Sequence, residues 1–351
     1  MSTRISDTLL GLVSCYSPSG QEEPAVKYLL ERMQILGYDR IFQDSAGNAV
    51  GVLGKGARQI ILLGHIDTVP GEIPVRVEDG VLYARGSVDA KGPLAAFTDA
   101  AAITGARNGW QIIVIGAVGE EADSRGAHFL VDQYRPEMVV IGEPSAWDRI
   151  TMGYKGCAHA NITIHCEASH SANSEQTACE VAAQIWQGVQ SWTTAHNTNH
   201  GRRFEQLQNS LQHWSSGEDG FETWATLSIV GRLPESLHSD DWLLKLKEFA
   251  GEENVHVSGL PVQAYRGEKN TPLVRSFLKA VRETGGNPGF VVKTGTADMN
   301  IVAPAWQCPA VAYGPGDSNL DHRPNEHLSL DEYNKAVQVL TKALTDITSY
   351  P

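Results

Sequence analysis

The chain has 351 residues, of which 42% are hydrophobic and 20% charged, and its formal net charge is −13. The length predicts two domains, and the composition is that of a folded globular enzyme, which excludes a disordered chain. The negative charge argues against a phosphate-binding face, so we expect no nucleic-acid partner. We also expect no membrane span, because apolar runs such as 60–63 and 112–115 are far too short.

The N-terminal residues and the cysteines indicate a cytoplasmic protein. Residues 1–11 lack the basic start and apolar core of a signal peptide. The cysteines are odd in number and contain no CxxC pair, which argues against a disulfide framework and a structural zinc knot. We interpret them as buried thiols of a reducing compartment: Cys15, Cys157, Cys166, Cys179 and Cys308.

The first half of the chain alternates predicted helices and strands. Residues 19–36 place apolar side chains at the spacing of an amphipathic helix. Continuous apolar strands separated by helices predict a mixed, largely parallel α/β sheet with helices on both faces. The predicted strands cover 47–53, 59–63, 111–118 and 138–141, and further helices cover 93–104 and 126–134.

The pattern changes after about residue 151. Polarity alternates along 156–167, as in a strand with one solvated face. The elements that follow are a helix over 174–193, hairpin strands over 206–214 and 221–233, a helix over 240–249 and a strand over 255–265. This order of strand, helix, strand, strand, helix, strand predicts a compact α+β insert of the ferredoxin-like type.

The α/β pattern then resumes, with a helix over 272–284, strands over 290–293 and 310–313, and a closing helix over 330–349. We therefore predict a catalytic domain formed by residues 1–151 and 267–351. A lid domain of residues 152–266 interrupts it.

The clearest candidate site follows the apolar strand that ends in GHIDTVP (64–70). His65 and Asp67 leave the carboxyl end of this strand on one side, because side chains alternate with period two. Ligand sites of open α/β sheets lie at that edge. A metal-binding imidazole needs its other nitrogen held by an acceptor, and Asp67 is placed to do this.

Further carboxylates and a histidine follow other predicted turns. Asp89 lies between glycines, Glu120 and Glu121 follow a strand, and Glu143 is fixed before Pro144. A Gly/Pro-rich loop then ends in His322, with His327 five residues later, so spacing alone leaves the choice of histidine open.

Two imidazoles and three carboxylates are the ligands that two neighbouring divalent metals need when one carboxylate bridges them. No thiolate is among them, which suits hard or borderline cations. Such a site makes hydroxide at neutral pH and polarises a carbonyl, the chemistry of amide hydrolysis. The candidate ligands are His65, Asp89, Glu121, Glu143 and His322.

Seven motifs together resemble those of the acetylornithine deacetylase, succinyl-diaminopimelate desuccinylase and glutamate carboxypeptidase family of di-zinc hydrolases. The run 293–300 resembles its [LysW]-lysine/[LysW]-ornithine hydrolase branch, whose members release lysine or ornithine from an amino-group carrier protein in biosynthesis. The motifs are GHIDTVP, GSVDAKG, GEEADSRG, GEPS, ASHSA, KTGTADMN and YGPGDSNLDHRPNEH.

The resemblance implies a role for each matching residue. His65, Asp89 and Glu143 would hold one metal, and Asp89, Glu121 and His322 the other; His322 is preferred because it matches the family's histidine. The family also has a cis peptide at the position of Asp89–Ala90. Glu120 would be the general base, Asp67 the partner of His65, and His170 an oxyanion donor to the neighbouring subunit. The implied substrate-binding residues are Arg232, Lys293, Gly295 and Thr296.

The resemblance also implies a homodimer through the lid, and two zinc ions, with cobalt as the alternative metal. The substrate would be an amino-acid-derived amide, carried by an acidic carrier protein. Because this chain is itself acidic, such a carrier would need a local basic rim. One alternative is a small-molecule N-acyl-amino-acid deacylase, acting on acetylornithine, acetyl-lysine or succinyl-diaminopimelate, or a related carboxypeptidase. The other is a binding protein that lost the chemistry.

Overall fold

The computed structural model describes residues 5–170 and 172–349, which form two compact units. Unit 1 runs to Gly153 and resumes over Gly267–Val292 and from Ala297 onward, whereas unit 2 comprises Tyr154–Arg266 and Lys293–Thr296. The four residues 293–296 join unit 2 although the sequence prediction assigned them to the catalytic domain. Their backbone and side chains explain this, because Lys293 O accepts a bond from Lys155 N (3.2 Å) and Thr296 Oγ1 accepts one from Arg232 Nη1 (3.0 Å).

The main sheet of unit 1 is mixed, with parallel strands at its centre. Strand β3 is parallel to β6 and β7, and β15 is parallel to β7, whereas β2 pairs with both β1 and β6 in the antiparallel sense. This confirms the predicted fold class. Across the sheet the order is β1 (Arg40–Gln43), β2 (Ala49–Leu53), β6 (Trp110–Ala117), β3 (Arg58–His65), β7 (Met138–Gly142), β15 (Ala310–Ala312) and β8 (Arg149–Tyr154), and β14 (Gly289–Lys293) pairs with β8.

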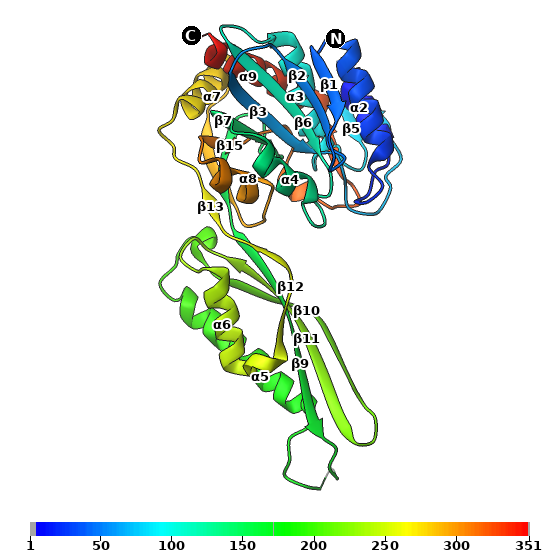
Figure 1. Ribbon diagram of the computed structural model, residues 1–351, viewed down its shortest axis with the longest axis vertical. Helices are drawn as coiled ribbons and strands as arrows, with labels where there is room; N and C mark the ends of the chain where they lie inside the picture. Colours follow the sequence, from blue (N-terminus) through cyan, green and yellow to red (C-terminus); the bar gives the residue numbers. More distant parts are fainter. Residues whose placement is uncertain (1–4, 171, 350–351) are drawn as a thin grey trace. The chain divides into compact units, whose positions relative to one another are not determined.

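Helices cover both faces of this sheet, which is why its strands are apolar throughout. Ile60 and Leu62 of β3 pack into a core shared with helices α1, α2, α3, α7 and α9, whereas Ile61 and Leu63, equally buried, alternate with them and therefore point to the opposite face. Figure 1 shows α3 and α9 behind the sheet and α4 and α8 in front of it. The helices are α1 (Asp7–Ser14), α2 (Glu23–Ile35), α3 (Lys91–Thr104), α4 (Arg125–Gln133), α7 (Pro272–Glu283), α8 (Met299–Trp306) and α9 (Leu330–Thr348).

A small antiparallel sheet joins two distant parts of unit 1. It consists of β4 (Arg76–Glu78), β5 (Val81–Tyr83) and β16 (His327–Ser329), in the order β16-β5-β4. Strands of three residues are too short to show a polarity period, so the sequence did not predict them. Their pairing places the segment after β5 beside the segment before β16.

Unit 2 is an antiparallel four-stranded sheet with two helices packed on one face (Figure 1). Ala158, Ala160 and Ile162 of β9 face the helices, in the alternation that the sequence predicted. The elements are β9 (Gly156–Glu167), α5 (Ala178–Asn197), β10 (Gln208–Glu218), β11 (Glu222–Leu233), α6 (Ser239–Ala250) and β12 (Val255–Val262), followed by the short β13 (Tyr265–Arg266), with 3-10 turns at Arg203–Glu205 and Glu252–Asn254. The strand order β10-β11-β9-β12 has the ferredoxin-like arrangement. None of the helices in the described part of the chain has the length and apolar character to cross a membrane.

Candidate active site

His65 and Asp67 lie at the carboxyl end of β3 and are almost fully buried. His65 Nδ1 lies 3.0 Å from the backbone oxygen of Asp67 and 3.6 Å from its Oδ1, so the carbonyl makes the shorter contact. The Asp67 carboxylate accepts hydrogen bonds from the backbone N–H groups of Glu120 and Glu121, at 3.1 Å each, and from Ser19 Oγ at 2.6 Å. Asp67 therefore orients the ring of His65 and also fixes the loop that carries the two glutamates.

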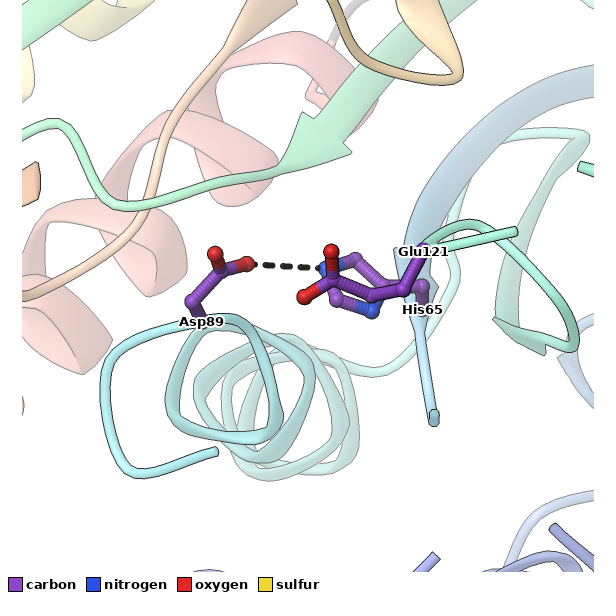
Figure 2. A group of neighbouring side chains, drawn as sticks. All are labelled: His65, Asp89 and Glu121. Atoms are coloured by element: carbon purple, nitrogen blue, oxygen red, sulfur yellow. Dashed lines mark hydrogen bonds and ion pairs between the residues drawn. The ribbon is translucent and has the colours of Figure 1, made fainter. Parts of the chain in front are cut away.

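Asp89 presents one carboxylate oxygen to each of two imidazoles. Its Oδ1 lies 3.1 Å from His65 Nε2, and its Oδ2 lies 3.2 Å from His322 Nε2. The Asp89–Ala90 peptide bond is cis, as the resemblance implied. Figure 2 shows Asp89 facing His65, with Glu121 beside the imidazole. A carboxylate that faces two ligand groups in this way has the geometry of a bridge between two cations.

A second carboxylate accompanies each imidazole. Glu121 Oε2 lies 3.0 Å from His322 Nε2, and Glu143 Oε1, at the end of β7, lies 3.8 Å from His65 Nε2. Ligand atoms of His65, Asp89 and Glu121 all lie within 4.8 Å of one another. The five predicted ligands thus form two sets that share Asp89, and their imidazole and carboxylate donors fit a pair of hard or borderline divalent cations.

The charges within this cluster compensate one another. Burial lowers the pKa of His65, but hydrogen bonds to Asp67 and Asp89 outweigh it and hold that pKa well above its usual range. Asp89 and Glu121 raise the pKa of His322 to about 10. Burial would raise the pKa of Asp89, yet hydrogen bonds from His322 and His65 lower it. Because a cation binds neutral imidazole, its binding must displace these imidazole protons.

Glu120 has the environment of a proton carrier. Burial raises the pKa of its carboxyl well above the usual range; His65 opposes that shift, and the negative charges of Glu143 and Asp298 add to it. Its backbone N–H is held by Asp67, so its position is fixed from within the protein. A carboxylate with a raised pKa is a stronger general base than that of an ordinary glutamate.

His327, the alternative to His322, lies elsewhere. It belongs to β16, where its ring lies beside that of Tyr83 in a tilted arrangement with centroids 5.1 Å apart, and its Nδ1 lies 2.7 Å from Asn325 O. His322 follows the 3-10 turn Ser318–Leu320 and has a left-handed backbone with φ of 61°. Of the two histidines, His322 is the one that contacts Asp89 and Glu121.

The predicted substrate residues and His170 lie in unit 2. Arg232, on β11, contacts Thr296, and Lys293 is held at the backbone by Lys155, as described above. A Cβ atom added at Gly295 would lie more than 4 Å from every atom outside its chain neighbours. His170 is exposed, and its Nδ1 accepts a bond from Ala172 N at 3.2 Å; Ser171 of the same motif lies outside the described residues.

Two buried carboxyls near the site were not singled out from the sequence. Asp298 is 2% exposed, burial raises its pKa to about 7, and its Oδ1 has no hydrogen-bond partner among the described residues. Glu326 is fully buried and bonded to the backbone of Asp89. Both residues belong to motifs that carry the resemblance. The signal that could have found them is a charged residue that lies in such a motif and has no role assigned to it.

Comparisons with known proteins show the family of this chain and the proteins that it resembles. The profile described as peptidase family M20/M25/M40 matches residues 61–346. A "[LysW]-lysine hydrolase" of Deinococcus radiodurans is 43% identical, covering 95% of this chain and 94% of the relative. A "Putative [LysW]-lysine/[LysW]-ornithine hydrolase" of Thermococcus kodakarensis is 40% identical, covering 96% of this chain and 90% of the relative. The crystal structure of the M20 family metallo-carboxypeptidase Sso-CP2 from Sulfolobus solfataricus has a similar fold, with a TM-score of 0.80 at 17% identity over 99% of this chain and 100% of that one.

Proposed function

The chain belongs to peptidase family M20/M25/M40, and from this premise we propose that it hydrolyses the amide bond between lysine or ornithine and a LysW-type carrier protein. The observation that carries the chemistry is the carboxylate of Asp89, which presents one oxygen to each of two imidazoles. The observation that supports the substrate is the likeness, over nearly the whole chain, to proteins named for that reaction.

The proposed metal ligands are the two sets that share Asp89. His65, Asp89 and Glu143 would hold one divalent cation, and Asp89, Glu121 and His322 would hold the other. We propose zinc, with cobalt as a substitute, because imidazole and carboxylate ligands suit both. When bound, the two cations would make a nucleophilic hydroxide available at neutral pH and polarise the amide carbonyl.

The chain's own residues would move the proton. Glu120 would accept a proton from the attacking water and later deliver it to the nitrogen of the leaving lysine or ornithine. Its raised pKa makes the carboxylate of Glu120 a stronger base for the first transfer than an ordinary glutamate. Asp67 would keep Glu120 in place through its backbone N–H.

In unit 2, Arg232 and Thr296 are proposed to bind a substrate carboxylate, with Lys293 and Gly295 completing that region. Arg232 Nη1 donates to Thr296 Oγ1, and a guanidinium so held is preorganised for an anionic group. The anionic group that Arg232 would bind is the α-carboxylate of the amino acid or an acidic side chain of the carrier.

The test of this function is a comparison of substrates on purified, zinc-loaded enzyme. We expect kcat/KM for lysine or ornithine linked to the carrier to exceed that for acetylornithine, acetyl-lysine and succinyl-diaminopimelate by at least about tenfold, or ~1.4 kcal/mol. Equal or faster cleavage of a small acyl-amino acid would replace this function with the deacylase alternative. A protein that binds zinc but cleaves none of these amides would support the alternative of a binding protein.

His170 is proposed to stabilise the oxyanion in the active site of a second copy of the chain. His170 is exposed, so it is not buried by packing within its own unit. We expect His170→Ala and His65→Ala each to be inactive alone, and co-expressed mixtures to recover about a quarter of wild-type activity, because half of the random dimers hold one complete site. Activity that stays at background in mixtures proven to contain mixed dimers would refute a shared site.

A further inference from the structure

A buried ion pair lies beside the candidate metal ligands but contributes none of them. Arg85 Nη1 is 2.9 Å from Glu326 Oε2, and the two side chains are 8% and 0% exposed. The pairing of β5 with β16 explains why they meet. Tyr83 is opposite His327 in the antiparallel register, so the residues that follow β5 and the residue that precedes β16 are neighbours.

The carboxylate of Glu326 holds the backbone that presents the shared ligand. Its Oε1 accepts hydrogen bonds from Val88 N at 2.8 Å and from Asp89 N at 3.1 Å. Two N–H groups and a guanidinium therefore satisfy this one buried carboxylate. Because Asp89 N is one of the two donors, a shift of Glu326 would move the backbone of the ligand itself.

The guanidinium of Arg85 holds the other loop. Its Nη1 also donates to the backbone oxygen of Arg323 at 3.2 Å, and its Nε donates to Gly71 O at 2.9 Å. Arg323 directly follows His322 in the chain. The pair thus connects the backbone of Asp89 to the backbone next to His322. We refer to Arg85 and Glu326 together as the clamp.

The two imidazoles differ in how strongly the rest of the protein fixes them. The side chain of His65 is 2% exposed, its residue ends a central strand, and Asp67 holds its ring. The side chain of His322 is 53% exposed, and its residue has a left-handed backbone that an L-residue rarely adopts. The position of His322 therefore depends more on the loop that carries it, and the clamp fixes that loop.

Stability alone is a poor explanation for the clamp. The free energy lost in desolvating a buried ion pair is about as large as the gain from the attraction between its charges. Such pairs are therefore weak evidence for stability, and fixing a unique geometry is a better-attested use. The geometry that this pair fixes is the separation between the Asp89 and His322 loops.

We propose that Arg85 and Glu326 are positioning residues that set this separation, and that their loss weakens cation binding by Asp89, Glu121 and His322 more than binding by His65, Asp89 and Glu143. This inference rests on the proposed two-metal function. The groups that orient metal ligands from behind typically change metal affinity by about 10–100-fold when removed.

The experiment titrates zinc into metal-free protein against a chromogenic chelator and resolves the number and affinity of the sites. Wild type is expected to bind two zinc ions. Glu326→Ala should bind the first with near wild-type affinity and the second about 10–100-fold more weakly. Glu326→Gln keeps an oxygen for the two N–H groups but loses the charge that faces Arg85, so its second site should be intermediate.

The matched control is Glu137→Gln, which breaks an exposed pair with Arg58 of the same 2.9 Å length. It should bind both zinc ions as wild type does. Thermal unfolding of each metal-free variant identifies any that fail to fold, and Arg85→Lys, which keeps the charge but loses the forked geometry, then replaces an unfolded Glu326→Ala.

Two results would overturn the clamp. One is a folded Glu326→Ala or Arg85→Lys protein that binds two zinc ions as tightly as wild type, and the other is an equal loss at both sites. These readouts are independent of turnover. A wild-type protein that binds two zinc ions yet cleaves none of the amides would refute the proposed function while leaving the zinc titration of the variants informative.

Discussion

Glu120→Gln is expected to lower kcat by about 10²–10⁴-fold while metal content stays near that of the wild type. The amide keeps the size and the backbone of the glutamate, so the hydrogen bond from its N–H to Asp67 is retained. It cannot accept a proton from water or return one to the leaving nitrogen. Steady-state kinetics and metal analysis of the same preparation test both halves of this prediction.

The neighbouring Asp123 offers a control from the same loop. Its side chain is 65% exposed, and Asp123→Asn should leave kcat within about twofold of wild type, as expected for an exposed substitution away from the reacting groups. Substantial turnover by Glu120→Gln would remove Glu120 from its role as base. Loss of metal in that variant would instead make it a structural part of the metal site.

Asp89→Asn is expected to prevent stable binding of both cations, whereas Glu143→Gln should weaken only one. The carboxylate of Asp89 serves both imidazoles, so neutralising it removes a charge from each ligand set. Glu143 Oε1 lies 3.8 Å from His65 Nε2, so we propose that Glu143 belongs to the His65 ligand set alone. Metal-to-protein ratios after gel filtration should approach zero for the first variant and one for the second.

Activity of Asp89→Asn should fall by at least about 10²-fold, because the reaction needs the metal pair. The outcome that contradicts the shared-ligand arrangement is two equivalents of zinc retained by Asp89→Asn. Equal loss from both variants would mean that Glu143 supports both sets. Thermal unfolding in the presence of chelator checks that the substitutions leave the fold intact.

The central part of the site was predictable from sequence because it depends on parallel strands. His65 ends one buried apolar strand, Glu121 and Glu143 come after two others, and the carboxyl ends of β3, β6 and β7 meet at one edge of the sheet. Residues far apart in the chain could therefore be expected to lie together before any geometry was known.

Spacing alone could not choose between His322 and His327; the resemblance favoured His322, and the structure places His322, not His327, beside Asp89 and Glu121. Both histidines follow the same glycine-rich loop, and only the pairing of β16 with β5 shows that His327 belongs to a strand. Strands as short as these carry no readable period. The clamp escaped prediction for the same reason, since Arg85 and Glu326 are 241 positions apart and meet only through this pairing.

Helix α8 and the tip of the β10–β11 hairpin show two other limits. Helix α8 contains Pro304, which in a sequence usually indicates a break, but the helix is only eight residues long and packs its apolar residues in the interior. The sequence predicted hairpin strands over 206–214 and 221–233, with residues 215–220 as the turn between them. The strands continue through Glu218 and Glu222, and Asp219 closes the turn by accepting bonds from two backbone N–H groups.

The separation of residues between the two units has an evolutionary consequence. All five proposed metal ligands and Glu120 belong to unit 1, whereas Arg232 and residues 293–296 belong to unit 2. Under the proposed function, substitutions that alter substrate preference can accumulate in unit 2 without disturbing the proposed metal ligands and Glu120 in unit 1. Divergence of substrate preference on a constant reaction centre is the expected history of such an architecture.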